Sequence, residues 1–511
     1  MTAAAETGPG GTAGENATEE SGPEERTAAE RAPGTGAGAG AGAGTGAGAG
    51  SRPETGAATD TATGTETDTG DPPGPPAVRT VARRLLPLLF VLYVVNFLDR
   101  ANIGVAALAM NAELHLTTTA YGTAAGIFFI GYLAFQVPAA WALNRFGARR
   151  WLAGVITAWG LCSAATAFVT EARGLYLARF LLGLAEAGFF PGVVAYLTTW
   201  FPARRRTRAL AAFLLAIPIA TAIGLPTSGL LVEHAGLFGF SGWRSMFLIE
   251  GAPAVVLGIA ALRLLPDSPD RAAWLTTAQR RELASELAHD APPARTGGTV
   301  VRRVAHFALV QAGMAFGAYS LQFFLPQVLT ALFPGAHTSG VSALAALPYA
   351  VAVPVMLLWS RYGDRVGHRT SLITGPIAAS ALAAACAAVS RLPLLTLAAL
   401  TVMVAANLAA VPALWSRCTG ALAGRHAATA IAGVNALANI ASFAGPSVTG
   451  RLADTTGGYP AVYAVIACVM ATSWAAARRL PAPPKPVAVV PPQAAPPPQP
   501  SPTTLPDGTT G

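Results

Sequence analysis

The sequence predicts an all-α polytopic membrane protein with 12 transmembrane helices in two six-helix bundles. Hydrophobic residues make up 52% of the 511 residues and charged residues only 12%, whereas soluble domains carry roughly 25% charged residues. From residue 85 to residue 478 the chain divides into apolar stretches long enough to cross a bilayer as helices. These stretches are continuously apolar and do not alternate, which excludes a barrel of transmembrane strands.

The apolar stretches follow one another at short intervals. We expect the spans at 85–107, 120–143, 151–170, 174–200, 207–232, 244–265, 304–331, 340–360, 370–389, 393–416, 427–449 and 459–477. Arginines gather in the loops that follow the even-numbered spans, whereas the other loops hold few beyond Arg173, Arg244 and Arg391. Because cytoplasmic loops carry the excess of basic residues, we expect a cell-membrane protein with both termini in the cytoplasm.

The remaining segments lie outside the bundles. Residues 1–79 are rich in Gly, Ala, Thr and acids, and 480–511 are rich in Pro, so we expect two disordered cytoplasmic tails. The first bundle is expected at 80–265 and the second at 304–479. The polar segment between them, 266–303, is a cytoplasmic linker whose stretch WLTTAQRRELASELAHD predicts a short helix.

The two bundles contain matching basic turns after their second spans. Each turn has a glycine flanked by arginines, a pattern that favours a duplicated bundle; two unrelated basic turns are the alternative. The candidate gating residues are Asn144, Arg145, Gly147 and Arg149 in the first turn and Asp364, Arg365, Gly367 and Arg369 in the second.

These turns resemble the loop signature of the major facilitator superfamily. The segments NFLDRANIGVAAL, YGTAAGIFFIGY, ARFLLGLAEAGFFPGV, WFPARRRTRA and GWRSMFLIEGAPAV resemble, more narrowly, its anion:cation symporter family of organic-acid carriers. The second half matches through FFLPQVL, VNALANIASFAGPSVTG and DTTGG. The resemblance implies the major facilitator fold, with substrate bound between the halves. Asn144 departs from the family pattern, which has Asp there.

Charged side chains inside the first half mark a candidate transport path, because a charge at the bilayer centre costs at least about 2.5 kcal/mol. Tyr93, Asn96 and Arg100 fall on one helix face, where the arginine could anchor an anion. Arg179 and Glu186 share a face of the fourth span. The stretch that includes Gly183, Gly188 and Gly192 favours close helix contact.

Two carboxylates are candidates for proton coupling. Asp99 and Glu186 lie in apolar spans, where a carboxylate takes up protons readily unless a cation keeps it ionised. The family resemblance independently implies acidic residues in proton coupling and arginines in substrate binding. The alternative is structural salt bridges, Asp99 with Arg179 or Arg100 with Glu186. Glu250, in FLIEGAP, is interpreted as structural at a helix crossing.

The second half offers polar groups but no deep charge. Gln322, Asn435 and Asn439 are the candidate substrate contacts, and interhelical hydrogen bonding is their structural alternative. Tyr319 and Phe324 could line a cavity or serve packing. The four cysteines are scattered and the seven histidines form no cluster, so we expect no metal site, no catalytic residues and no disulfide.

The combined interpretation is a secondary transporter, not an enzyme, that imports a small organic anion with protons by alternating access. Its expected partners are that anion and the lipid bilayer, with no nucleic acid, and we expect a monomer. The proton serves as coupling ion, without a cofactor. An exporter or exchanger of drugs or metabolites, and a non-transporting membrane sensor, remain the alternatives.

Overall fold

The computed structural model describes residues 75–288, 300–367, 369–421 and 427–480. The described residues are mostly helical, and 12 helical segments are long and apolar enough to cross a membrane. The predicted fold class is therefore confirmed. The two expected tails, apart from residues 75–79 and Leu480, and part of the expected linker lie outside the described residues.

The first half supplies the helices of six spans. They are α1 (Pro76–Glu113), α2 (Thr118–Phe146), α3 (Ala148–Ala165), η1 (Thr166–Phe168), α4 (Ala172–Glu186), α5 (Phe189–Trp200), α6 (Ala203–Leu214), α7 (Ala216–His234), η2 (Leu237–Gly239) and α8 (Gly242–Leu264). Helix α1 begins four residues before the boundary expected at residue 80, since Pro76 supplies a proline at the helix start, where no backbone donor is needed.

The linker and the second half follow. They contain η3 (Pro269–Arg271), α9 (Thr277–Ala288), α10 (Val300–Leu332), α11 (Thr338–Val366), α12 (Ser371–Val389), α13 (Pro393–Ala421), α14 (Ala427–Thr456) and α15 (Pro460–Ala477). Helix α9 confirms the short linker helix. Its Glu282 accepts a hydrogen bond from the backbone nitrogen of Ala77 at 3.2 Å, so the linker helix is tied to the start of α1.

The fourth span is interrupted between α4 and α5, which the sequence pattern did not predict. The break lies at Gly188, whose backbone oxygen accepts a hydrogen bond from the Trp151 indole of α3 at 3.2 Å. A Cβ added to Gly188 would lie 2.4 Å from that indole ring. The ring thus occupies the space that a side chain would need, and the close contacts predicted for these glycines are confirmed.

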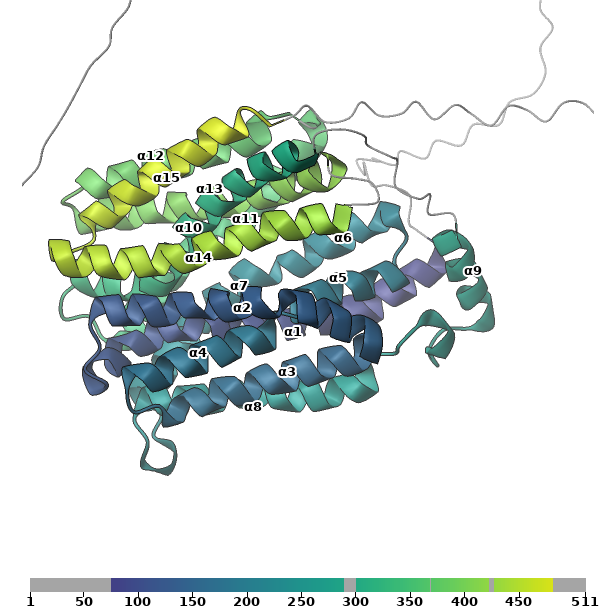
Figure 1. Cartoon of the computed structure of the whole chain (residues 1–511), viewed down its shortest axis with the longest axis horizontal. Helices are drawn as coiled ribbons and strands as arrows, with labels where there is room; N and C mark the ends of the chain where they lie inside the picture. Colours follow the sequence, from purple (N-terminus) through teal and green to yellow (C-terminus); the bar gives the residue numbers. More distant parts are fainter. Residues whose placement is uncertain (1–74, 289–299, 368, 422–426, 481–511) are drawn as a thin grey trace, which may run out of the picture. The chain divides into compact units, whose positions relative to one another are not determined.

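Helices of the two halves meet at the end where α1 turns into α2, which we call the joined end (Figure 1). Asp454, near the end of α14, accepts a hydrogen bond from the backbone nitrogen of Thr119 at 2.7 Å. Glu233, near the end of α7, accepts one from the backbone nitrogen of Ser339 at 2.9 Å. Both carboxylates therefore lie at the N-terminus of a helix of the other half, where the helix dipole favours negative charge.

Small residues allow the backbones to approach at the joined end. A Cβ added to Gly122 of α2 would lie 2.4 Å from the backbone oxygen of Pro446, and one on Gly450 of α14 would lie 2.3 Å from that of Thr118. Helices α2 and α14 run side by side in Figure 1. This contact depends on the absence of side chains at both glycines.

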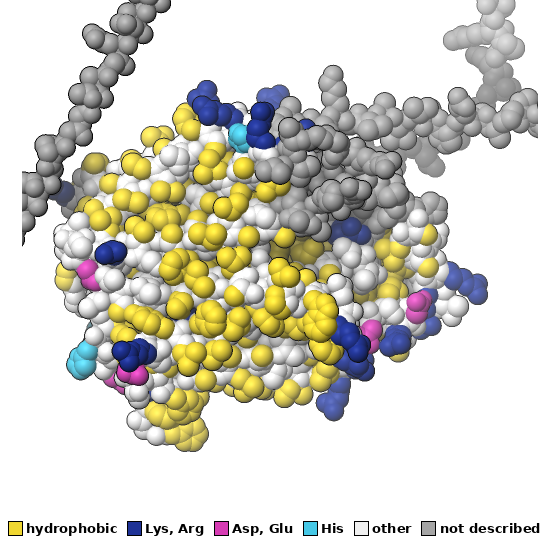
Figure 2. All heavy atoms as spheres, in the orientation of Figure 1, with side chains coloured by type: hydrophobic (Ala, Val, Ile, Leu, Met, Phe, Trp, Pro, Cys, Tyr) yellow, Lys and Arg dark blue, Asp and Glu magenta, His cyan; other side chains and the backbone are white. Residues whose placement is uncertain are grey.

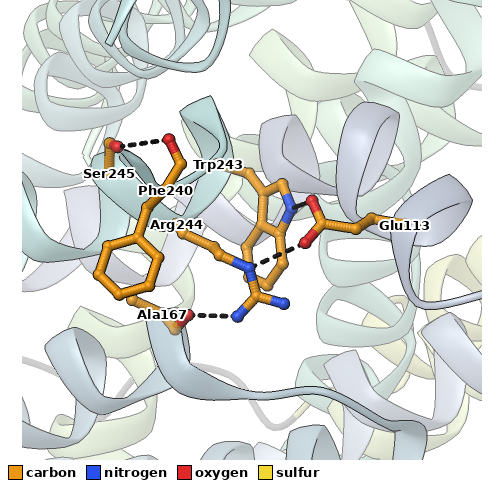
Figure 3. Close-up of polar contacts among 6 residues, drawn as sticks. All are labelled: Glu113, Ala167, Phe240, Trp243, Arg244 and Ser245. Atoms are coloured by element: carbon orange, nitrogen blue, oxygen red, sulfur yellow. Dashed lines mark hydrogen bonds and ion pairs between the residues drawn. The ribbon is translucent and has the colours of Figure 1, made fainter. Parts of the chain in front are cut away.

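A polar cluster ties three elements of the first half together at the same end (Figure 3). The Glu113 carboxylate of α1 accepts hydrogen bonds from the Trp243 indole at 2.6 Å and from Nε of Arg244 at 2.9 Å. Arg244 also donates to the backbone oxygen of Ala167 in η1. Arg244, one of the few arginines outside the basic loops, is thus held by contacts within its own half.

The surface agrees with a membrane protein. Apolar side chains are spread over the middle of the described face in Figure 2, while the charged side chains lie mainly near its margins. Large apolar side chains such as Val137, Leu177 and Leu382 are more than half exposed on their helices. In water such a surface would be unfavourable, whereas lipid chains accommodate it.

Candidate functional site

Among the described residues of the first half, five charged side chains are buried. Asp99 and Arg100 come from α1, Arg179 and Glu186 from α4, and Glu250 from α8. None is more than 8% exposed. The cluster contains one more carboxylate than guanidinium groups, and these charges share one low-dielectric interior in which their mutual interactions are strong.

Arg100 and Glu186 form an ion pair between α1 and α4. This is one of the two structural salt bridges that the sequence offered as the alternative to proton coupling. The other alternative, between Asp99 and Arg179, is not found among the described residues. The pair uses one guanidinium nitrogen and one carboxylate oxygen, while Nε of Arg100 and Oε1 of Glu186 have no hydrogen-bond partner in the described part of the chain.

Arg179 is the distinctive member of the cluster. It is 0% exposed, and none of its three guanidinium nitrogens has a hydrogen-bond acceptor among the described residues. Leaving buried donors of a charged group unsatisfied is expensive, at roughly 1–3 kcal/mol or more for each group. A guanidinium in this condition is complementary to a carboxylate, which it can bind through two parallel hydrogen bonds.

The ring of Phe128 contacts both arginines. Its centroid is 4.9 Å from Cζ of Arg100 and 5.1 Å from Cζ of Arg179. A second ring, Phe323 of α10, lies 6.0 Å from Arg179 and brings the second half to the cluster. Aromatic faces attract cations and keep water away, so these rings position both guanidinium groups without neutralising them.

Asp99 has a simpler environment. Its Oδ1 accepts a hydrogen bond from the Ser163 hydroxyl of α3 at 2.8 Å, and its Oδ2 has no partner among the described residues. The residue is 0% exposed. No ion pair to Asp99 is found among the described residues.

Glu250 differs from the other two carboxylates. Its Oε2 accepts a hydrogen bond from the Asn102 amide of α1 at 3.0 Å, and its Oε1 accepts one from the Ser228 hydroxyl of α7 at 2.7 Å. It lies where α1, α7 and α8 meet, in agreement with the interpretation of a helix crossing. No ion pair to Glu250 is found within the described ranges.

The other predicted contacts of the first half lie on the same helix as Arg100. Asn96 is 1% exposed and its amide nitrogen has no acceptor among the described residues. Tyr93 is stacked on Phe213 of α6, with ring centroids 4.1 Å apart, which makes it part of an aromatic cluster. Asn96 therefore remains a candidate ligand contact, whereas the ring of Tyr93 is engaged in packing.

In the second half two predicted amides are buried with free donors. The side-chain nitrogens of Gln322 and Asn439 have no acceptor among the described residues, and both residues are less than 9% exposed. Asn435 is half-buried on α14. Tyr319 lies 4.5 Å from Phe129 by ring centroids, so it packs across the two halves, and Phe324 packs on Tyr121 in the same way.

The two predicted gating turns have matching backbones. Gly147 ends α2 with φ +80°, and Gly367 ends α11 with φ +74°. These conformations favour glycine. Arg149 donates to the backbone oxygen of Leu262 and lies 3.7 Å from Asp267. The side chains of Asn144, Arg145, Arg365 and Arg369 are exposed, and that of Asp364 lies outside the described residues.

Several residues of this region were not singled out from the sequence. Phe128, Phe323, Ser163, Asn102 and Ser228 all contact the charged cluster or its partners. The sequence offered one signal for the three polar residues, namely their position inside apolar spans. The aromatic residues carried no signal, since most buried rings serve packing.

Comparisons with known proteins show the family of the chain. The chain matches the family model described as Major Facilitator Superfamily over residues 89–340 and 307–505. It is 42% identical to a protein of Agrobacterium vitis named "Putative tartrate transporter", over 75% of this chain and 86% of that protein. It is 35% identical to a quinolone resistance transporter of Acinetobacter baumannii, over 77% of this chain and 92% of that protein.

A solved structure supports the fold. The inward open conformation of the xylose transporter XylE from E. coli matches with a TM-score of 0.64 at 16% identity, over 79% of this chain and 97% of that chain. The anion:cation symporter resemblance is consistent with the relatives that carry the tartrate transporter name. By its helices, its family match and its relatives, the chain is a multi-pass membrane transporter that belongs to the Major Facilitator Superfamily.

Proposed function

We propose that this transporter carries a small organic anion together with protons, by exposing a central site alternately to the two sides of the membrane. The single observation that carries the proposal is the buried Arg179 guanidinium without a hydrogen-bond acceptor. A carboxylate bound there would compensate its charge and accept its hydrogen bonds. A cationic substrate would instead add charge of the same sign.

Three buried amide groups indicate the kind of anion. Gln322 and Asn439 of the second half, and Asn96 of the first, each hold a buried amide nitrogen without an acceptor in the described part of the chain. Such donors pair with carboxylate, hydroxyl or carbonyl oxygens. A sugar acid, a dicarboxylate or an aromatic carboxylate would supply these oxygens, and it would contact both halves at once.

The ion pair between Arg100 and Glu186 provides a route for proton coupling. An anion that approaches Arg100 competes with Glu186 for the guanidinium. Once released, the Glu186 carboxylate is buried without a cation, which favours its protonation. Asp99, which has no cation partner, would take up a proton when the anion adds negative charge nearby. Both carboxylates thus link anion binding to proton binding.

The relatives support an organic anion as substrate. Two proteins of Agrobacterium vitis that are 42% and 41% identical to this chain both carry the name of a tartrate transporter. The charge pattern supports a cell-membrane location with both termini in the cytoplasm. In that orientation the joined end faces outward, and the site opens toward the cytoplasm when substrate is released.

Export is the second candidate function. The quinolone resistance transporter that matches at 35% identity supports an exporter of drug-like compounds. Substrates of both candidates could carry a carboxylate, so Arg179 serves either function. The direction of coupled movement distinguishes them, because an importer accumulates substrate on the side that protons enter.

Uptake into proteoliposomes tests the proposal. The purified full chain is reconstituted, and the accumulation of radiolabelled tartrate, galacturonate, succinate and benzoate is measured with and without an inward proton gradient. Accumulation that requires the gradient and stops with a protonophore is the expected result. Gradient-independent transport of cationic or neutral compounds, with none of the carboxylates, would contradict the proposal.

A further inference from the structure

We infer that Glu250 is a third proton-carrying carboxylate, which links proton binding to separation of the two halves at the joined end. This inference rests on the proposed function. It assigns a transport role to a residue that the sequence indicated as structural. The argument uses its hydrogen-bond partners, the charge of the cluster and the positions of those partners on α1 and α7.

The partners of Glu250 accommodate either protonation state. Asn102 has an amide that donates through Nδ2 or accepts through Oδ1, and the Ser228 hydroxyl can donate or accept. In the structure both groups donate to Glu250, which is the arrangement expected for its ionised form. When a proton from water binds to Oε2, that oxygen donates to Asn102 Oδ1 after the amide turns over. Oδ1 is buried and has no partner among the described residues.

Glu186 is held differently from Glu250. Glu186 is paired with Arg100, which stabilises its ionised form. A Glu250 that served only packing would need no more than a fixed amide or an apolar side chain at this crossing. Both partners of Glu250 can instead reverse their hydrogen bonds, and the Ser228 hydroxyl does so without movement of a heavy atom. Such partners are suited to a group that gains and loses a proton.

The charges around Glu250 link its protonation electrostatically to substrate binding. On α1, Asp99 lies one turn before Asn102, and it interacts electrostatically with both Glu250 and Glu186. On α3 the thiol of Cys162 lies next to Ser163, the partner of Asp99, whereas Arg149 and Arg150 lie at the opposite end of that helix, and η1 has no titratable group. The charged groups of α7 and α8 that lie nearest are bound elsewhere, Glu233 to Ser339 and Arg244 to Glu113.

This charge balance leads to a prediction about stoichiometry. With all five buried groups ionised, the three carboxylates exceed the two arginines by one negative charge. A bound monocarboxylate adds a further negative charge, and a dicarboxylate such as tartrate or succinate adds two. Burying uncompensated charge is strongly unfavourable, so the site loaded with a dicarboxylate needs three protons to be neutral. Asp99, Glu186 and Glu250 would then carry one proton each.

Both partners of Glu250 lie beside contacts between the halves. Ser228 precedes Gly229, where an added Cβ would lie 2.5 Å from the side chain of Ser342 on α11. Asn102 lies two residues before Gly104, where an added Cβ would lie 3.1 Å from the backbone oxygen of Phe323 on α10. A change in the hydrogen bonds of Glu250 therefore acts directly on the helix segments that join the halves.

The test compares the Glu250→Gln variant with the original chain in proteoliposomes. Proton entry is followed with an internal pH dye, and uptake of radiolabelled tartrate, succinate or benzoate is followed in the same vesicles. Glutamine keeps a hydrogen-bonding group of the same size but cannot carry a proton. We expect the number of protons per substrate to fall by one and gradient-driven accumulation to fall at least tenfold, while exchange of internal for external substrate continues.

The matched control is Glu113→Gln, which removes a carboxylate that accepts hydrogen bonds within the first half and outside the buried cluster (Figure 3). Its proton stoichiometry should equal that of the original chain. If Glu250→Gln also keeps the original stoichiometry and accumulation, Glu250 is structural and the inference is wrong. If the original chain itself shows no proton-driven uptake of any carboxylate, the proposed function fails instead.

A second variant covers the case in which Glu250→Gln does not fold. Ser228→Ala removes one reversible partner and leaves the carboxylate in place. We expect it to move the pH dependence of tartrate, succinate or benzoate uptake, because the two protonation states of Glu250 lose unequal hydrogen bonds. An unchanged pH profile in Ser228→Ala would contradict the inference.

Discussion

The Asp454 carboxylate near the end of α14 accepts a hydrogen bond from the backbone nitrogen of Thr119, in the first turn of α2, at 2.7 Å. Glu233 near the end of α7 has the same relationship with Ser339, in the first turn of α11. Each half thus gives one carboxylate to a helix start of the other half. These paired contacts stabilise the arrangement in which the joined end is closed.

Neutralising Asp454 should weaken the joined end. In Asp454→Asn the favourable interaction with the α2 terminus is lost, and we expect the closed population to fall about two- to fivefold relative to the open one. Spin labels at the exposed positions Glu171 and Arg391, in a chain without native cysteines, would report the distance between the halves there. An unchanged distance distribution would show that Asp454 does not stabilise closure.

A side chain at the glycine contact should have a stronger effect. In Gly450→Ala the new Cβ would lie 2.3 Å from the backbone oxygen of Thr118, so α2 and α14 cannot approach as they do here. We expect substrate uptake to fall at least tenfold while the variant remains folded. Gly154→Ala is the matched control, since no atom lies within 4 Å of its added Cβ. Equal uptake by both variants would argue against this contact.

The Phe128 ring that contacts both arginines should contribute to anion binding. Phe128→Leu keeps an apolar side chain but removes the aromatic face that contacts Arg100 and Arg179. We expect the Kd of a carboxylate ligand to rise roughly threefold to thirtyfold. Phe247→Leu is the control, because Phe247 is equally buried and its ring contact is with Trp243. A similar Kd in both variants would exclude a positioning role.

Asp99→Asn should separate exchange from accumulation. The amide preserves the hydrogen bond with Ser163 but cannot carry a proton. We expect substrate exchange across proteoliposomes to continue and gradient-driven accumulation to fall at least tenfold. Accumulation at the original level in Asp99→Asn would remove this residue from proton coupling.

Much of the fold could be predicted from the sequence, because hydropathy alone defines helices that must cross a bilayer. The break between α4 and α5 could not, since it depends on the indole of Trp151 packing against Gly188. Boundaries also differed where polar residues extend a helix beyond the apolar stretch, as at the start of α1.

The charged site was predicted in part for a similar physical reason. Helical spacing places Arg179 and Glu186 on one face of α4, but it cannot decide which arginine reaches the carboxylate. The structure pairs Glu186 with Arg100 and leaves Arg179 without an acceptor among the described residues. The contact of Thr119 with Asp454 joins residues 335 positions apart, and no local pattern predicts it.

The most direct test of the account is thermal stabilisation of the detergent-purified chain by carboxylates, with Arg179→Gln measured in parallel. A ligand that binds only the folded protein raises its Tm in proportion to the logarithm of concentration over Kd. We expect tartrate, galacturonate, succinate or benzoate to raise the Tm of the original chain and not that of the variant. Stabilisation of both proteins to the same extent, or by cationic compounds alone, would contradict the assignment of Arg179 as the anion-binding group.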